Sequence, residues 1–250
     1  EWQVADVADL DGDGKADLLW RHTGTGALYA WRLDGLVPTG YWDLGVPDAG
    51  WSPVGAADLD GNGTADILFR HADGTLYAWL MLGGTIASHG AIGTAPADSA
   101  IADLADVNGD GKADIVWRRT TDGEVFHWLM NGLASLGGES MGTVDPALWT
   151  LIAADDFNGD GKADLLWRAT TGEAYVWLMN GATVLSRGSL ANPGGAWSIR
   201  AVADFTGDGK ADLLWRHTDG SGYLWTLSGT TITAAVPVAN PGGSWQVVHP

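Results

Sequence analysis

The stretch that decides the fold is DLDGDGKADLLWR, which runs from Asp9 to Arg21. It places four aspartates and two glycines within nine residues, and an apolar run follows directly. The chain holds five such copies, and their leading aspartates are 49, 48, 50 and 48 residues apart. Those aspartates are Asp9, Asp58, Asp106, Asp156 and Asp204. A period near 48 residues predicts a repeat architecture in which each copy belongs to one structural unit.

Each unit carries the signals of four short strands, with no apolar period of 3.6 residues. In the first unit, a β-rich run enters the aspartate loop and Ala16–His22 reads as a second strand. A Gly/Thr turn leads to a third strand over Ala27–Leu33. The dipeptide Asp-Gly at 34–35 suits a type I′ hairpin turn and leads to a fourth strand around Leu36–Leu44.

Four antiparallel strands per unit, repeated radially, predict an all-β, five-bladed β-propeller with the aspartate loop between the first and second strands of each blade. Large aromatic side chains that recur at fixed positions support this count. A propeller with few blades leaves wide wedges between neighbouring blades, and large side chains fill them. A β-solenoid is the alternative, but its rungs are usually shorter. We expect one domain over 1–250, with repeats at about 2–50, 51–98, 99–148, 149–196 and 197–244 and a partial sixth copy at 245–250.

The acidity of the chain is concentrated in the loops. The formal net charge is −18, yet 16 of the 31 acidic residues stand in the five motifs and the other 15 face 13 Lys and Arg. This charge argues against nucleic acid and anionic membranes as partners. There is no cysteine and no run of about 18 apolar residues, so we expect no thiol chemistry and no membrane insertion.

The loop composition predicts a calcium site. Counted from the leading aspartate, oxygen-bearing side chains stand at positions 1, 3, 5 and 9, and glycines at 4 and 6 permit a left-handed backbone. Ca²⁺ takes six to eight hard oxygens at about 2.3–2.6 Å. We expect up to five ions, one per loop, each held by those four side chains and the backbone carbonyl at position 7. The residues are Asp9, Asp11, Asp13, Lys15 and Asp17; Asp58, Asp60, Asn62, Thr64 and Asp66; Asp106, Asn108, Asp110, Lys112 and Asp114; Asp156, Asn158, Asp160, Lys162 and Asp164; and Asp204, Thr206, Asp208, Lys210 and Asp212.

Other interpretations of the loop are weaker. An EF-hand needs a bidentate Glu at position 12, where this chain has Trp20, and helical flanks. Magnesium demands a stricter octahedron, and zinc prefers Cys or clustered His. Asp and Gly are also common in ordinary turns, but five copies at one spacing are hard to explain that way.

The units resemble the FG-GAP or VCBS repeats of secreted bacterial proteins, relatives of the integrin α-subunit propeller with its calcium-binding hairpin loops. The resemblance covers essentially the whole chain and rests on D-x-[DNT]-G-[DN]-G-x-x-D followed by the LLWR-type strand. It implies an extracellular setting, calcium in the loops and a binding or scaffolding role, often beside a catalytic or adhesive domain. Neither "FG" nor "GAP" occurs in the chain, so integrin-like ligand recognition is not carried over.

Two repeated rows could instead form a ligand surface. An arginine ends the second strand of every unit, and a tryptophan recurs in every third strand: Arg21, Arg70, Arg118, Arg168 and Arg216, with Trp31, Trp79, Trp128, Trp177 and Trp225. An inter-blade ion pair or a guanidinium stacked on a ring is the structural interpretation of the arginines. Core packing is the structural interpretation of the aromatic rings, and a sugar-stacking platform is the functional one.

The sequence offers one enzymatic hint. Asp6 and Asp103 share a first-strand position, and such carboxylates could meet on the propeller axis as in a glycoside hydrolase. Three histidines also share one position, but an active site normally breaks the symmetry of a repeat. We therefore predict a protein that is not an enzyme.

We expect a calcium-stabilised binding, adhesion or scaffold module, possessing lectin-like carbohydrate binding or serving as a purely structural appendage of a larger secreted enzyme or adhesin. Glycans or a cell-surface protein are the expected partners, and the protein is expected to be monomeric. The chain starts at Glu1 without methionine or signal peptide, which fits a mature or excised piece of a secreted bacterial protein. SWQVV at 244–248 repeats the entry EWQV at 1–4, and we expect Trp245 to act as a strap between the last and first blades.

Overall fold

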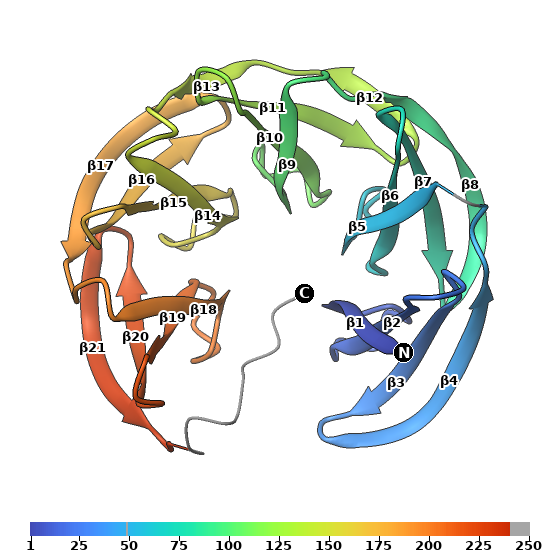
Figure 1. The fold of residues 1–250 in the computed structure, drawn as a ribbon, viewed down its shortest axis with the longest axis horizontal. Coiled ribbons are helices and arrows are strands. Elements are labelled where there is room, and N and C mark those ends of the chain that lie inside the picture. The colour runs from blue at the N-terminus through green and yellow to red at the C-terminus, as the bar shows by residue number, and fades with distance from the viewer. Residues whose placement is uncertain (49, 241–250) are drawn as a thin grey trace.

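The structure is a computed structural model that describes residues 1–48 and 50–240. Viewed down the axis, five sheets stand as blades of a propeller (Figure 1). Blade 1 contains β1 (Trp2–Ala8), β2 (Asp17–His22), β3 (Leu28–Asp34) and β4 (Val37–Gly45). Blade 2 contains β5 (Trp51–Ala57), β6 (Asp66–His71), β7 (Thr75–Leu82) and β8 (Thr85–Thr94).

The later blades repeat this plan. Blade 3 contains β9 (Ser99–Ala105), β10 (Asp114–Arg119), β11 (Glu124–Asn131) and an outer strand in two pieces, β12 (Ala134–Gly137) and β13 (Ser140–Thr143). Blade 4 contains β14 (Trp149–Asp155), β15 (Asp164–Ala169), β16 (Ala174–Asn180) and β17 (Thr183–Ala191). Blade 5 contains β18 (Trp197–Ala203), β19 (Asp212–His217), β20 (Gly222–Ser228) and β21 (Thr231–Val238).

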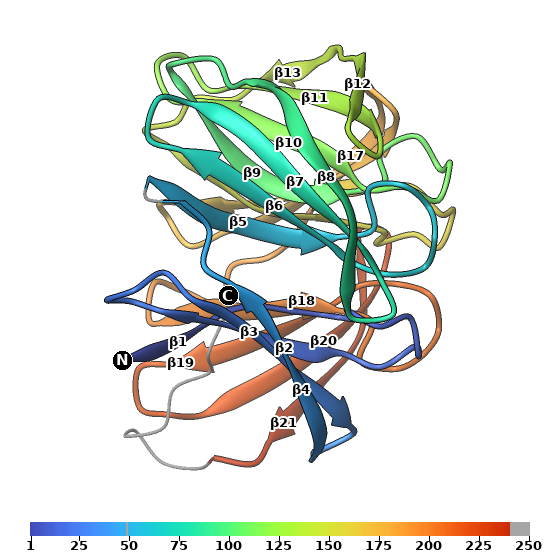
Figure 2. The same ribbon diagram turned by 90° about the vertical axis from the view of Figure 1, so that its right-hand side faces the viewer.

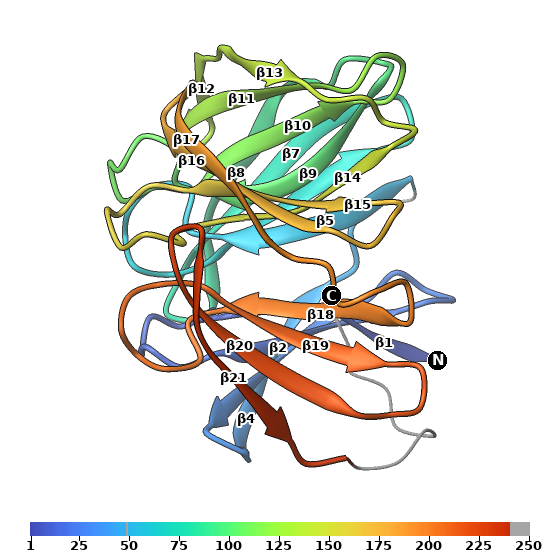
Figure 3. The ribbon, with the colours of Figure 1, turned by 90° about the vertical axis from the view of Figure 1, so that its left-hand side faces the viewer.

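The predicted fold is confirmed. Each sheet is an antiparallel meander that runs from an inner strand at the axis to an outer strand at the rim. Within the described ranges there is no helix, and so none that could cross a membrane. The loops between the first and second strands all project from one end of the propeller (Figures 2 and 3). The expected strap residue Trp245 lies outside the described residues.

Every inner strand carries a β-bulge at the same place. In blade 1 the pairing of β1 with β2 shifts register between Val4 and Asp6, and the corresponding shifts occur in β5, β9, β14 and β18. A bulge bends its strand and re-aims the side chains that follow it. The bulge therefore sets which side chains of the inner strands turn toward the axis.

The core consists of four apolar clusters, one in each wedge between consecutive blades from blade 1 to blade 5. Second-strand rings lie at their centres, and all four are at most 1% exposed: Phe69, Trp117, Trp167 and Trp215. These large rings fill the wedges, as the sequence predicts. No corresponding cluster joins blade 5 to blade 1 among the described residues, and we call this junction the seam.

Backbone hydrogen bonds join the loop end of each blade to the next. The carbonyl of the leading aspartate accepts the N–H of the alanine at position 8 of the next loop, at 2.7 Å in four wedges. The carbonyl of the residue after it accepts a glycine N–H from the outer hairpin turn of the next blade, at 2.6–3.1 Å. Buried backbone groups need such partners. The spacing of the loops is therefore coupled to the spacing of the blades.

Candidate functional site

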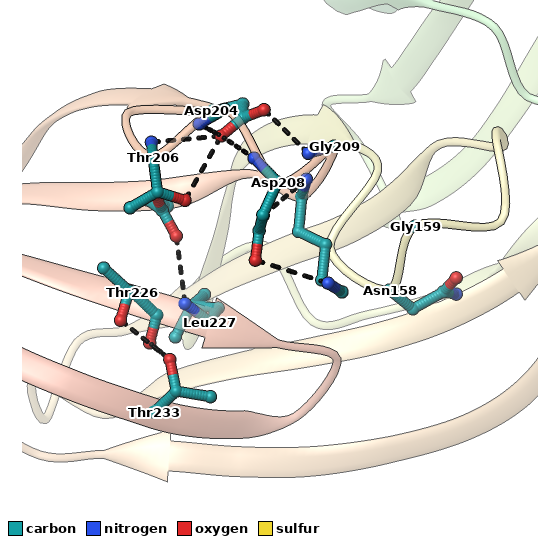
Figure 4. Close-up of polar contacts among 12 residues, drawn as sticks. Asn158, Gly159, Asp204, Thr206, Asp208, Gly209, Thr226, Leu227 and Thr233 are labelled. Atoms are coloured by element: carbon teal, nitrogen blue, oxygen red, sulfur yellow. Dashed lines mark hydrogen bonds and ion pairs between the residues drawn. The ribbon is translucent and has the colours of Figure 1, made fainter.

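The leading aspartate organises each loop. In the fifth loop, Asp204 Oδ1 accepts the N–H groups of Gly207 at 2.6 Å and Asp208 at 3.2 Å, and Oδ2 accepts that of Gly209 at 2.8 Å (Figure 4). The other four loops have the same three bonds. Both glycines of every loop have φ of 77–83°, which a residue with a side chain adopts only at a cost.

The ninth-position aspartate ties the loop to its blade. Asp164 Oδ2 accepts the N–H of Phe157 at 3.2 Å, and Oδ1 accepts that of Met179 on β16 at 2.7 Å. The equivalent aspartates make the same pair of bonds, and all five are at most 1% exposed. Removal from water raises the pKa of Asp164 to about 7, although its N–H partners oppose the shift and its neighbours Asp160 and Asp156 add to it.

In the first two loops, the side chains at the first, third and ninth positions converge. In the first loop, carboxylate oxygens of Asp9, Asp11 and Asp17 lie within 4.8 Å of one another. The second loop brings Asp58, Asp60 and Asp66 together in the same way. The third position is Asn108, Asn158 and Thr206 in the remaining loops, which offer an amide or hydroxyl oxygen instead.

The fifth position is hydrogen-bonded to the backbone N–H two residues later. Asp13 Oδ1 accepts the N–H of Lys15 at 3.0 Å, and Oδ2 lies 3.5 Å from the Lys15 ammonium. The same turn recurs in the other loops, with a threonine N–H donating to Asn62 in the second. The position-7 side chain also lies over the position-4 glycine of the preceding loop, since a Cβ added to Gly159 would be 3.4 Å from Lys210. Consecutive loops are therefore stacked as well as hydrogen-bonded.

The loop residues fit a hard dication. Each loop has at least three side chains that offer an oxygen ligand, and backbone N–H groups hold the leading aspartate in place. In the first two loops, the closely grouped carboxylates repel each other unless a cation lies between them. In the first loop, Arg32 offsets part of this repulsion, because its Nε lies 2.8 Å from Asp11 Oδ2 and its Nη2 lies 3.6 Å from Asp13 Oδ2. Arg32 has no equivalent arginine in the other units, so it does not explain the repeated loop.

The arginine row lies between blades. Arg118 donates to the carbonyls of Val144 at 3.2 Å and Trp149 at 2.7 Å, and its guanidinium lies 5.0 Å from the ring centre of Trp167. Arg168 makes the equivalent contacts with blade 5, and Arg21 and Arg70 each donate to the first residue of the next inner strand. These arginines hold the start of the next blade in place.

The third-strand tryptophans also face a neighbouring blade. Each packs on the second-strand ring of its own blade at 4.7–5.2 Å between ring centres. A Cβ added to Gly93 or Gly142, on the outer strand of one blade, would touch Trp128 or Trp177 of the next. Four of the row are half-buried in wedges, whereas Trp31 of blade 1 is 42% exposed.

The first-strand carboxylates bridge inner strands. Asp6 Oδ2 accepts the N–H of Ala56 at 2.5 Å, and Asp103 Oδ2 accepts that of Ala154 at 2.7 Å. Withdrawal from water raises the pKa of Asp103 to about 6, with smaller contributions from Asp155 and Asp6. All three carboxylates line an axial cavity of about 560 Å³. The structure thus gives Asp6 and Asp103 a bridging contact, and the glycosidase alternative stays untested.

Sequence reasoning offered an inter-blade contact for the arginine row but missed the hydrogen bonds that join consecutive loops. The available signal was the alanine at position 8 of all five motifs, a small residue whose N–H reaches the preceding loop. A second signal was the proline in every segment between blades: Pro47, Pro96, Pro146 and Pro193. We call these segments, 46–50, 95–98, 144–148 and 192–196, the connectors.

Comparisons with known proteins agree with this geometry. The FG-GAP-like repeat model matches residues 9–69, 58–117, 106–167 and 156–215. Each match runs from one loop to the second strand of the next blade, so the sequence unit straddles a wedge. No curated protein matches the chain.

Two solved structures are similar to the chain at low identity. Raptor from Chaetomium thermophilum is 9% identical with a TM-score of 0.50, and the match covers 97% of this chain and 25% of Raptor. The computationally designed Ika8 protein is 15% identical with a TM-score of 0.49, and the match covers 96% of this chain and 63% of Ika8. The chain therefore spans less than two thirds of either protein. Its four tandem repeat matches and five blades show that it belongs to the FG-GAP-like repeat family.

Proposed function

We propose that this propeller is a non-catalytic binding or scaffold module of a secreted protein, stabilised by one Ca²⁺ in each of its five loops. The observation that carries the proposal is the loop geometry: the leading aspartate accepts the same backbone N–H in all five loops, and in the first two loops carboxylate oxygens of the first, third and ninth positions converge. A repeat-family propeller supports a binding or scaffold role in general.

The proposed ligands in each loop are the side chains at positions 1, 3, 5 and 9 and the backbone carbonyl at position 7. A bound dication supplies charge neutralisation. The backbone N–H groups on the leading aspartate hold its carboxylate in one orientation, so little order remains to be imposed when the ion binds.

An extracellular setting suits such sites. Extracellular modules bind Ca²⁺ with dissociation constants of about 10⁻⁴–10⁻³ M. At ten times its dissociation constant an ion stabilises the folded state by about 1.4 kcal/mol, so five independent ions contribute about 7 kcal/mol. That is comparable to the whole stability of a typical domain.

Thermal unfolding in calcium, magnesium and EGTA tests this proposal. We expect a large rise in melting temperature with Ca²⁺, a small one with Mg²⁺ and the lowest value in EGTA. The double variant Asp58→Asn, Asp60→Asn should lose about one fifth of the calcium increment, and the surface variant Asp73→Asn none of it. An equal melting temperature in Ca²⁺ and EGTA would show that the loops are not structural calcium sites.

Carbohydrate binding is a second candidate because an aromatic groove of about 460 Å³ lies where the segment after β4 meets blade 2. Trp51, Tyr77 and Trp79 line it, with Asp48 and His89 as polar groups, and Tyr77 Oη is hydrogen-bonded to His89 Nδ1 at 2.5 Å. Aromatic faces with a few polar groups are typical of ligand grooves.

A glycan array separates the candidates. Binding that is lost in His89→Ala and kept in the matched variant Ser88→Ala, on the same strand but outside the groove, supports carbohydrate recognition there. No binding to any glycan would leave cell-surface proteins or a purely structural role. A glycosidase panel on the same protein tests catalysis, and turnover that Asp103→Asn abolishes would overturn the non-catalytic proposal.

A further inference from the structure

Blade 3 has a buried histidine where the other blades have an aliphatic side chain. His127 on β11 pairs with Val116 on β10. The residues at the same register in the other four blades are Ala30, Ala78, Val176 and Leu224. The His127 side chain is 3% exposed, and its Nδ1 has no hydrogen-bond partner among the described residues. A buried polar atom without a partner costs free energy, so packing alone does not account for a histidine at this position.

The outer strand of blade 3 is interrupted opposite this histidine. The pairing of β11 with β12 ends at Leu129, and its pairing with β13 begins at Phe126. His127 lies in the break, where its N–H donates to the Glu139 carbonyl at 3.2 Å. In the other four blades, the residue at this register is paired with one continuous outer strand. The outer strand of blade 3 is therefore held least firmly beside the buried imidazole.

The break is specific to this blade. Loops 3 and 4 are 50 residues apart, the longest of the four spacings, so the third unit has room for additional residues in its outer strand. Gly138, in the break, packs so closely on the backbone of β11 that an added Cβ would be 1.7 Å from the His127 carbonyl oxygen. Only glycine fits there, so the break is a built feature of the blade.

Few charged groups surround the imidazole. Glu139, in the break, is the one acid with an electrostatic effect on His127 among the described residues. The cations of the adjoining wedge, Arg118 and Arg187, lie on tryptophan rings of blade 4, and Asp145 of the connector 144–148 lies near Arg118. Withdrawal from water lowers the pKa of His127, and Glu139 opposes this shift in part. The closed blade therefore holds the neutral imidazole.

We propose that His127 is a proton-sensing switch that opens the outer strand of blade 3 in mildly acidic solution. When the imidazole takes up a proton, it leaves its buried position, and β12 and β13 separate from β11 at the break. Histidine suits this role because its ordinary pKa of about 6.5 lies just below neutral pH. The proposal depends neither on calcium nor on a glycan.

The direction and size of the effect follow from proton linkage. The closed blade excludes the proton, and the opened blade accepts it with an ordinary histidine pKa of about 6.5, so opening becomes easier only as pH falls below that value. Between pH 7.5 and 5.0 the population of the opened state should rise by up to about thirtyfold. Glu139 adds to the rise, because its carboxylate stabilises the imidazolium near the break.

Hydrogen–deuterium exchange of the full chain tests this switch at pH 7.5 and 5.0, with rates corrected for the intrinsic effect of pH on exchange. Calcium at about 10 mM, above the dissociation constants expected of the loops, keeps the loop aspartates from titrating. We expect the wild-type peptide 124–143 to lose about ten- to thirtyfold of its protection at the lower pH. His127→Leu, which gives blade 3 the residue of blade 5, should abolish this loss. The blade 2 peptide 75–94, with Ala78 at the same register, is the internal control and should not change.

An equal loss of protection in His127→Leu or in the blade 2 peptide would overturn the proposal, because groups other than His127 would then drive the opening. Unchanged protection of 124–143 in the wild type would overturn it as well. If His127→Leu does not fold, nuclear magnetic resonance of the wild type decides. The His127 ring should then stay neutral to below pH 6 and take up its proton together with shifts in the amides of 134–143, whereas a titration near 6.5 without those shifts would contradict the proposal.

Discussion

Replacing Arg118 with alanine tests whether the arginine row joins blades. Its guanidinium makes two hydrogen bonds to carbonyls of the segment that enters blade 4 and lies on the ring of Trp167. A hydrogen bond from a charged donor contributes about 1.5 kcal/mol or more, and a partly exposed cation–π contact about 0.5–1 kcal/mol. We therefore expect a loss of about 4 kcal/mol, or about 8–16 °C in melting temperature for a domain of this size.

Arg187 provides the matched control. It also lies 5.0 Å from a tryptophan ring centre, that of Trp177, but it is exposed on the outer strand. Arg187→Ala should cost about 1 kcal/mol or less. Arg118→Lys should recover little, because an ammonium cannot span both carbonyls while stacking on the ring. Thermal or urea unfolding in calcium measures all three variants, and equal losses for Arg118→Ala and Arg187→Ala would refute the reasoning.

Two further predictions concern single carboxylates. Because the pKa of Asp103 is raised to about 6, the folded state holds a proton there that the unfolded state has lost, so stability falls as pH rises from about 4 to 6. Urea unfolding in EGTA should show the wild type losing up to about 3 kcal/mol relative to Asp103→Asn over this range, and parallel pH profiles would contradict the assignment. Thr206→Asp gives loop 5 the third-position carboxylate that Asp11 supplies in loop 1, so calorimetry should show about tenfold tighter calcium binding at one site, about 1.4 kcal/mol. An unchanged affinity would argue against position 3 as a ligand.

Much of the fold could be predicted from the sequence because its signals are local. The expected third strand Ala27–Leu33 is β3, Leu28–Asp34, and the Asp-Gly dipeptide does turn the chain into β4. The tryptophan rows fill wedges because large rings repeat at the same strand positions. The alternation of apolar and polar residues along a strand and the dipeptides of hairpin turns depend on only a few neighbouring residues. Both can therefore be recognised from the sequence alone.

Apart from the arginine row, the contacts between blades could not be predicted in this way. The role of Asp6 depends on a bulge that turns its carboxylate toward Ala56, 50 residues away. The Asp13 carboxylate accepts the Lys15 N–H, because a short aspartate side chain reaches the backbone of its own turn. The exposure of Trp31 in blade 1 depends on how blade 5 and blade 1 meet in space, and a repeat pattern carries no information on the junction between its first and last copies.

Equilibrium dialysis of the full chain against calcium after chelation, with elemental analysis of the bound metal, tests the central claim most directly. Five Ca²⁺ ions per chain are predicted, with dissociation constants of about 10⁻⁴–10⁻³ M. The first loop, with four carboxylates, should fill first, and the fifth, with Thr206 at position 3, last. A chain that retains no calcium at millimolar concentration would contradict the claim.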